Sequence, residues 1–241
     1  MNTYLEFEKP IEQLDNKVHE LKSLNDNAPS DNLLEEITQV EEQINETYRK
    51  IYSSISPWQR TLVARHPQRP KTREYIQNLI EDFFPLSGDR FLSEDKAILG
   101  GFGKFRGKTV LVLGHEKGHD TTSRIEHNFG MPRPEGYRKA QRLMKLAEDF
   151  DIPVISFVDT PGAYPGVGAE QRGQSEAIAK TTECCLSLGV PIIAIIIGEG
   201  GSGGAVAIGT GNTVLMLENS IYSVISPCLL YTSPSPRDVC S

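Results

Sequence analysis

The first 60 residues carry apolar side chains at the spacing of amphipathic helices. Apolar positions recur every three or four residues, which places them along one side of a helix. A polar stretch from Asn25 to Asp31, which contains Pro29, interrupts this pattern and is typical of a turn. The apolar positions are Ile11, Leu14, Val18, Leu21, Leu33, Leu34, Ile37, Val40, Ile44 and Ile51. The pattern therefore predicts a helical hairpin at the start of the chain.

From residue 88 onward, short runs rich in β-branched residues alternate with helical stretches. The runs expected to form buried strands are Val110–Leu113, Ile152–Val158, Val190–Ile197 and Thr213–Leu217. The stretches expected to form helices are Tyr137–Phe150 and Gln171–Leu188. Alternation of this kind builds βαβ units, so we expect an α/β fold with a largely parallel sheet and helices packed against it.

Glycine marks the boundary between these two parts of the chain. All 21 glycines lie from Gly88 to Gly211, and residues 1–87 contain none. Glycine is favoured in tight turns and where a ligand approaches the backbone closely. The sequence therefore predicts an N-terminal helical segment over residues 1–87 and an α/β core over residues 88–227.

Composition narrows the classes of function. The 241-residue chain has a formal net charge of −7, and residues 1–60 hold most of it, with 12 acidic and 6 basic side chains. This charge gives no support to nucleic acid binding. The sequence contains no apolar run of about 18 residues and no basic start followed by an apolar segment. We therefore expect neither a membrane span nor a secretory signal, but a cytoplasmic protein.

The candidate metal ligands lack a recognisable spacing. Cys184 and Cys185 adjoin each other in a helical stretch, and no Cys-x-x-Cys pair exists. We expect them to be small buried residues rather than part of a zinc or disulfide site. The spacing of His115, His119 and His127 fits no common metal site, so we expect no metal in this chain.

Two glycine-rich loops follow predicted strands, where open α/β folds place their chemistry. The first runs DTPGAYPGVGAEQRGQSEA from Asp159 to Ala177, and the second runs GEGGSGGAVAIG from Gly198 to Gly209. Each consists of a strand end, a bend and the start of a helix. Such bends leave backbone N–H groups directed at a ligand, and the helix dipole favours negative charge there.

These loops are compatible with more than one chemistry. Gly198, Gly200 and Gly203 match the G-x-G-x-x-G fingerprint of dinucleotide sites, and Glu218 lies 20 residues on, where a ribose-binding acid would lie. However, that fingerprint usually opens its domain, whereas at least two predicted strands precede this loop. The DTPG of the first loop resembles a GTPase switch, but no phosphate-binding G-x-x-x-x-G-K-[ST] loop accompanies it.

A third interpretation is a pair of oxyanion holes. Backbone N–H donors at two bends can stabilise negative charge that develops on an oxygen, and losing one such donor costs about 3–4 kcal/mol of transition-state stabilisation. This chemistry needs no catalytic side chain, and the loops offer no Ser–His–Asp set. Ser202 lies among glycines without an identifiable base, so we expect it to be a structural serine.

Beyond the loops, longer motifs occur in a consistent order from about Leu5 to Pro227. They are ARHPQRP (Ala64–Pro70), GDR (Gly88–Arg90), NFGMPRPEGYRKA (Asn128–Ala140), DTPGAYPGVGAEQRGQSEAIA (Asp159–Ala179), GEGGSGGA (Gly198–Ala205) and YSVISP (Tyr222–Pro227). With these six motifs the chain resembles the carboxyltransferase alpha subunits of bacterial-type, multi-subunit acetyl-CoA carboxylases. Six ordered motifs are far more specific than one glycine loop.

The resemblance implies a crotonase-like fold, a βαβ spiral core preceded by the helical hairpin. It implies a carboxyltransferase that moves a carboxyl group from N-carboxybiotin, held on a biotin carboxyl carrier protein, to acetyl-CoA, giving malonyl-CoA for fatty acid biosynthesis. The implied assembly is α₂β₂ with a zinc-bearing beta subunit, in an ATP-dependent holoenzyme that includes biotin carboxylase. The alternatives are another acyl-CoA enzyme of the crotonase superfamily and, ranked below it, a dinucleotide-binding oxidoreductase.

The resemblance also sets the expectations for the site. We expect main-chain donors near the two bends to hold the ureido oxygen of carboxybiotin, with the released biotin nitrogen taking the acetyl proton. The expected donors are Gly162, Ala163, Gly200, Gly201, Gly203 and Gly204, of which the first four also bind the biotin ureido group. The basic stretch 115–145 would contact CoA phosphates or face solvent or a subunit, and Arg172 would form an ion pair on a helix surface.

The C-terminal end departs from the family's pattern. After YSVISP the chain continues as CLLYTSPSPRDVCS, residues 228–241, which has little structure-forming pattern and two prolines. We expect this stretch to be a non-family tail and the α/β core to be incomplete at its C-terminus.

Overall fold

The computed structural model describes residues 3–225, so the predicted tail at 228–241 lies outside the described residues. The chain divides into two compact units, Met1–Gln68 and Arg69–Ser241. The division thus falls earlier than the glycine boundary predicted after residue 87, because the glycine-free stretch 69–87 supplies a helix and an edge strand to the second unit.

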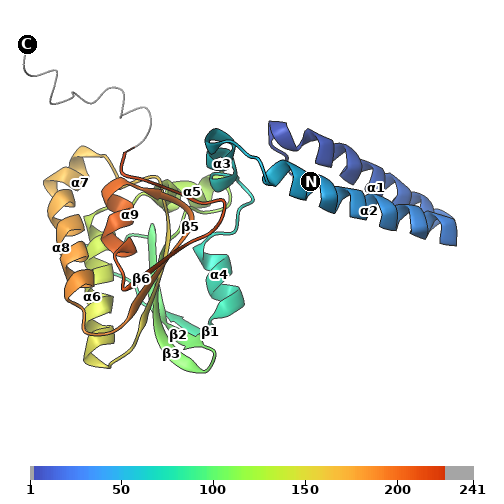
Figure 1. Cartoon of the computed structure of the whole chain (residues 1–241). Coiled ribbons are helices and arrows are strands. Elements are labelled where there is room, and N and C mark those ends of the chain that lie inside the picture. The colour runs from blue at the N-terminus through green and yellow to red at the C-terminus, as the bar shows by residue number, and fades with distance from the viewer. Residues whose placement is uncertain (1–2, 226–241) are drawn as a thin grey trace, which may run out of the picture. The chain divides into compact units, whose positions relative to one another are not determined.

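The first unit is a helical hairpin, as the apolar pattern predicted (Figure 1). Its helices are α1 (Lys9–Asn27), α2 (Asp31–Tyr52) and α3 (Pro57–Ala64), preceded by a short 3₁₀ turn at Glu6–Glu8. Val18 and Leu21 of α1 pack against Ile37 and Val40 of α2, and all four are buried. Ser56 caps α3, since its side chain accepts a hydrogen bond from the N–H of Gln59.

Up to residue 225, where the description ends, the second unit is built on one seven-stranded sheet. Its strands are β1 (Glu81–Pro85), β2 (Ile98–Phe105), β3 (Lys108–His115), β4 (Val154–Thr160), β5 (Ile192–Gly201), β6 (Thr213–Met216) and β7 (Ile221–Ser223). Its helices are α4 (Thr72–Leu79), α5 (Thr121–Glu126), α6 (Pro134–Asp149), α7 (Val167–Gln171), α8 (Gln174–Ser187) and α9 (Ser202–Gly209). The order along the sheet is β1-β2-β3-β4-β5-β6, with β7 also paired to β5.

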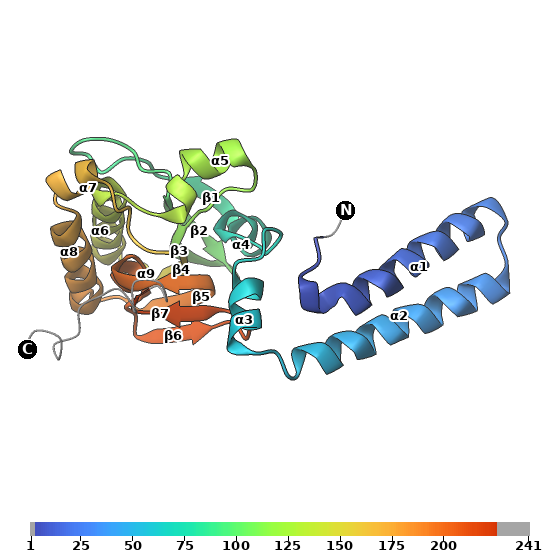
Figure 2. The same ribbon diagram turned by 90° about the horizontal axis from the view of Figure 1, so that it is seen from above.

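Helices cover both faces of this sheet (Figure 2). On one face α6, α8 and α9 bury a core that includes Leu143, Cys185 and Ile208. On the other face Ile76 of α4 and Ile80, which directly follows this helix, pack against the sheet. The strands lie between these two layers, and the carboxyl ends of β4 and β5 lead along the chain to α7 and α9.

The predicted strands and helices are present with shifted ends, and the sheet is largely parallel, as predicted. The pairs β3–β4, β4–β5, β5–β6 and β5–β7 are parallel, but β1–β2 and β2–β3 are antiparallel. The sequence pattern gave no signal for β2 because ILGGFGKF is rich in glycine, which is normally depleted in strands. The two antiparallel pairs therefore arise from β1 and β2, which were not predicted.

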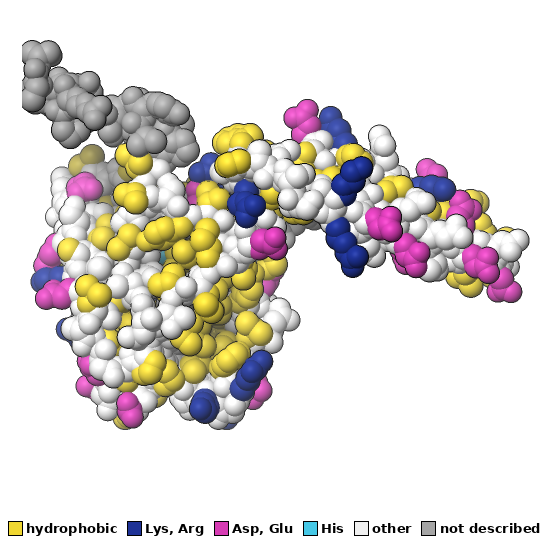
Figure 3. Space-filling view, in the orientation of Figure 1, with side chains coloured by type: hydrophobic (Ala, Val, Ile, Leu, Met, Phe, Trp, Pro, Cys, Tyr) yellow, Lys and Arg dark blue, Asp and Glu magenta, His cyan; other side chains and the backbone are white. Residues whose placement is uncertain are grey.

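Strand β6 exposes an apolar surface at the edge of the sheet. Its side chains Val214, Leu215 and Met216 are each about half exposed. Hydrophobic side chains gather on the face of the second unit that is turned to the viewer in Figure 3, and β6 crosses that face in Figure 1. Within residues 3–225, no helix is long and apolar enough to cross a membrane.

Candidate functional site

The two glycine loops lie side by side at the carboxyl ends of adjacent parallel strands. The first loop follows β4 and the second follows β5, and Thr160 at the end of β4 is paired with Gly200 at the end of β5. In a parallel sheet the carboxyl ends of neighbouring strands meet at the same edge. The two motifs that the sequence keeps 39 residues apart are thus joined by the sheet register.

The backbones of the two loops touch, which explains their glycines. A Cβ at Gly204 would lie 2.7 Å from the backbone nitrogen of Ala163 and 2.7 Å from the carbonyl carbon of Gly162. A Cβ at Gly201 would overlap the carbonyl group of Pro161. Since real Cβ atoms do not approach backbone this closely, any larger residue at either glycine must force the loops apart.

Six residues in these loops are candidate donors, and the structure separates them by access. Ala163 and Gly203 are partly exposed, whereas the other four are buried. The N–H of Gly162, which has φ +148°, donates to Oγ1 of Thr160 at 3.0 Å. Gly203 belongs to the first turn of α9, whose N–H groups have no acceptor within the helix.

Side chains from α8 and the loop before α6 anchor the first glycine loop. The amide Nε2 of Gln174 donates to the carbonyl oxygens of Pro132 at 2.9 Å and Tyr164 at 3.0 Å. The N–H of Tyr164 donates to the same Pro132 oxygen at 3.0 Å. The guanidinium of Arg133 lies 4.7 Å from the centre of the Tyr164 ring, a cation–π contact. These contacts hold Tyr164 in place and so restrict the backbone of Ala163, which directly precedes it.

The three histidines considered as ligands go to different surroundings. His115 is fully buried at the end of β3, and burial, with the nearby charge of Lys117, lowers its pKa to about 3, so its ring is neutral. His119 is exposed beside Glu74, and Nδ1 of His127 lies 2.6 Å from the carbonyl oxygen of Ser123. Among the described residues, no cluster of histidine, cysteine and carboxylate side chains could hold a metal ion.

Arg172, Cys184, Cys185 and Ser202 have the surroundings described below. Arg172 forms an ion pair with Glu135 at 2.6 Å, as expected. Cys184 and Cys185 are buried and unbridged, as expected, and burial raises the pKa of the Cys185 thiol to about 12. Ser202 is exposed with φ +51° at the start of α9, and no hydrogen bond in the described part of the chain joins it to a histidine.

A charged cluster next to the loops was not predicted. Nζ of Lys117 lies 2.7 Å from Oδ1 of Asp159 and 3.5 Å from Oε2 of Glu199. The two carboxylates carried a usable signal, because each occurs at the end of a predicted strand and just before a glycine bend. The sequence around Lys117 carried no such signal, because its contacts depend on the parallel pairing of β3 with β4.

Comparison with known proteins decides between the chemistries considered above. Residues 4–231 match the family described as acetyl co-enzyme A carboxylase carboxyltransferase-like. The acetyl-coenzyme A carboxylase carboxyl transferase subunit alpha of Paramagnetospirillum magneticum is 58% identical over 223 residues, 92% of this chain and 70% of that protein. The subunit of the same name from Rhodopseudomonas palustris strain BisA53 is 60% identical over 227 residues, 94% of this chain and 70% of that protein.

This chain belongs to the carboxyltransferase alpha-subunit family of acetyl-CoA carboxylase. Its activity is that of a carboxyltransferase subunit, and the dinucleotide and nucleoside triphosphatase interpretations of the loops are set aside. The subunit name of these relatives indicates a multi-subunit acetyl-CoA carboxylase.

Solved structures agree on the fold at much lower identity. The transcarboxylase 12S structure with hydrolysed methylmalonyl-coenzyme A superposes with a TM-score of 0.56 at 18% identity, over 66% of this chain and 30% of that chain. A single-chain, multi-domain long-chain acyl-CoA carboxylase gives 0.58 at 21% identity, over 72% of this chain and 18% of that chain. The predicted crotonase-like fold of the core is thereby confirmed.

Proposed function

We propose that this alpha subunit holds the ureido oxygen of N-carboxybiotin between its two glycine loops, through the N–H groups of Ala163 and Gly203. The observation that carries the proposal is their exposure: of the six candidate donors, these two are partly exposed and lie on different loops. Of the remaining candidates, Gly201 and Gly204 let the two loops approach each other, and Gly200 makes room for the ring of Tyr222. Gly162 supplies a backbone with φ +148°.

The surroundings of these two N–H groups suit an oxygen that becomes negatively charged. Gly203 lies in the first turn of α9, where the helix dipole adds a partial positive charge. Ala205 and Ile208 of the same helix are buried in the core, and a donor beside such an apolar region stabilises charge more than it would in bulk solvent. The imidazole of His115, kept neutral by burial, adds no competing charge.

This arrangement accounts for the reaction without a side-chain base. N-carboxybiotin supplies the carboxyl group and, once that group has left, the nitrogen that accepts a proton from the acetyl methyl group. The carboxyl carbon forms a new bond to the acetyl methyl carbon, which gives malonyl-CoA and uncarboxylated biotin. The chain itself positions the ureido group and stabilises the charge on its oxygen.

The proposal extends to the partners of the chain. A separate beta subunit would supply the acyl-CoA side of the site and its own zinc ion, in an α₂β₂ assembly. A biotin carboxyl carrier protein would deliver the carboxylated cofactor from biotin carboxylase. The name of the relatives, subunit alpha, supports an assembly of this general kind.

The reverse reaction tests this proposed function. The chain is mixed with a family beta subunit, malonyl-CoA and a free biotin derivative, and acetyl-CoA formation is measured. We expect transfer that requires both chains and the biotin derivative. A folded alpha–beta complex that forms no acetyl-CoA under these conditions would exclude the proposed function.

A further inference from the structure

The charged cluster beside the loops links the residues from which both loops start. Oδ1 of Asp159 accepts the N–H of Glu199 at 2.9 Å and contacts the Lys117 ammonium at 2.7 Å. Asp159 and Glu199 are only 4% and 7% exposed. Because the carboxylates are buried, their attraction to the lysine is weakly screened by salt and water. The cluster therefore ties the end of β4 to the end of β5.

Lys117 itself is held along its length. It follows β3 at a bend where the carboxylate of Glu116 accepts the N–H groups of Gly118 at 2.9 Å and Arg73 at 3.0 Å. The stem of its side chain runs past Gly130, where a Cβ would lie 2.5 Å from Cγ of the lysine. Gly130 has φ +76°, so the left-handed backbone and the missing side chain both make room for the stem.

The charged cluster lies directly before both glycine loops, so a shift of its side chains affects the loop backbones. Asp159 precedes Gly162 by three residues, and Glu199 immediately precedes Gly200. The packing at this level is tight, because a Cβ at Gly198 would lie 2.5 Å from Oδ1 of Asp159. A change in the separation of the two carboxylates must therefore move the backbones of the loops that follow them.

We propose that Lys117 is a positioning residue that sets the distance between the two glycine loops by binding the carboxylates of Asp159 and Glu199. The role of Lys117 in turnover rests on the proposed function, since the spacing matters through the donors Ala163 and Gly203. A mutation far from the reacting atoms can lower a rate by about 100-fold when it misplaces the substrate or a catalytic group by about 1 Å. The lysine acts through the loops and does not touch the substrate.

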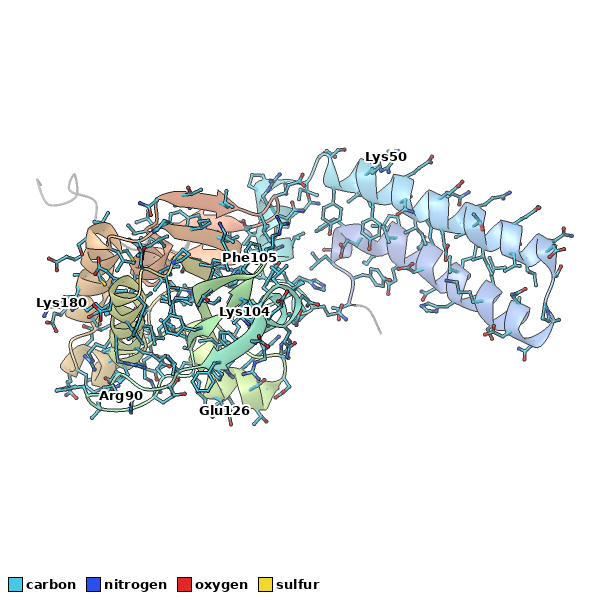
Figure 4. All side chains as sticks on the ribbon, turned by 90° about the horizontal axis from the view of Figure 1, so that it is seen from below. Lys50, Arg90, Lys104, Phe105, Glu126 and Lys180 are labelled. Carbon is cyan, nitrogen blue, oxygen red and sulfur yellow. The ribbon has the colours of Figure 1, made fainter. Side chains whose placement is uncertain are left out.

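Asp159→Asn and Lys117→Met test the proposal, with Lys117→Arg as the conservative variant. The asparagine keeps the shape and the acceptor for Glu199, so the chain should fold, but it removes the charge. Lys104→Met is the matched control because it removes an ammonium from an exposed ion pair with Asp82 at 2.8 Å on the β1–β2 hairpin (Figure 4).

With the beta partner present, we expect Asp159→Asn and Lys117→Met to lower kcat by about 10-fold or more while KM for the biotin derivative changes by less than about 3-fold. Lys117→Arg should restore thermal stability relative to the methionine variant but only part of kcat, because the guanidinium is larger and differently shaped. The Lys104→Met control should match the parent chain.

Hydrogen exchange in the alpha chain gives a second readout that does not depend on activity. Amides of residues 160–166 and 198–204 should exchange about 10-fold or more faster in Asp159→Asn than in the parent. Unchanged exchange in both loops would overturn the proposal, whether or not the chain transfers carboxyl groups. A loss of stability with kcat per folded molecule unchanged would overturn it too, whereas an inactive parent with altered exchange would count against the proposed function alone.

Discussion

Replacing Gly204 with alanine is expected to lower the turnover of carboxyl transfer by about 100-fold or more. The added methyl group would lie 2.7 Å from the backbone nitrogen of Ala163, one of the two proposed donors. The only relief is a displacement of the first loop away from the second. Steady-state assay of the alpha–beta complex with malonyl-CoA and a biotin derivative measures the effect.

Gly209→Ala is the control for this substitution. Gly209 ends the same helix, α9, but a Cβ there would meet Cγ2 of Val158 at 3.6 Å, an ordinary van der Waals contact. This variant should retain the turnover of the parent within about 2-fold. A substitution that creates no overlap, cavity or unpaired polar group usually changes stability little. Parental turnover in Gly204→Ala would mean that the close approach of the loops is not needed for catalysis.

The second large effect concerns the core that supports the loops. Leu143 of α6 is fully buried against the sheet, and a Cβ at Gly100 of β2 would overlap its side chain. Leu143→Ala leaves a cavity in this layer and should lower the free energy of unfolding of the second unit by about 3 kcal/mol. Urea unfolding followed by circular dichroism measures the loss.

Leu186→Ala provides the comparison for the core substitution. Leu186 lies on α8 in the same layer, but its side chain is 74% exposed. The same chemical change at this position should alter the free energy of unfolding by less than about 0.5 kcal/mol. Equal losses in the two variants would contradict the assignment of α6 to the buried face of the sheet.

The parts of the site that the sequence predicted are those encoded locally. Each glycine loop carries its strand, bend and helix start within about 20 residues, so both were found by pattern alone. The helical hairpin was also predicted from local sequence. Its two apolar stripes, which include Val18 and Val40, pack against each other. The family resemblance then indicated the chemistry that these local patterns left open.

What the sequence could not predict depends on strand neighbours. The contact between Gly204 and Ala163 arises because β4 and β5 are paired in register, and nothing in either segment specifies that register. Lys117 reaches Asp159 for the same reason, through the parallel pairing of β3 with β4. Access also escaped prediction, because the six candidate donors differ in burial only after the loops are packed.

The proposed donors can be tested most directly by a crystal structure of the alpha–beta complex with a biotin derivative bound. The account predicts that the ureido oxygen lies about 3 Å from the backbone nitrogens of both Ala163 and Gly203, within hydrogen-bond range. An active complex in which that oxygen lies beyond hydrogen-bond reach of both loops would contradict it.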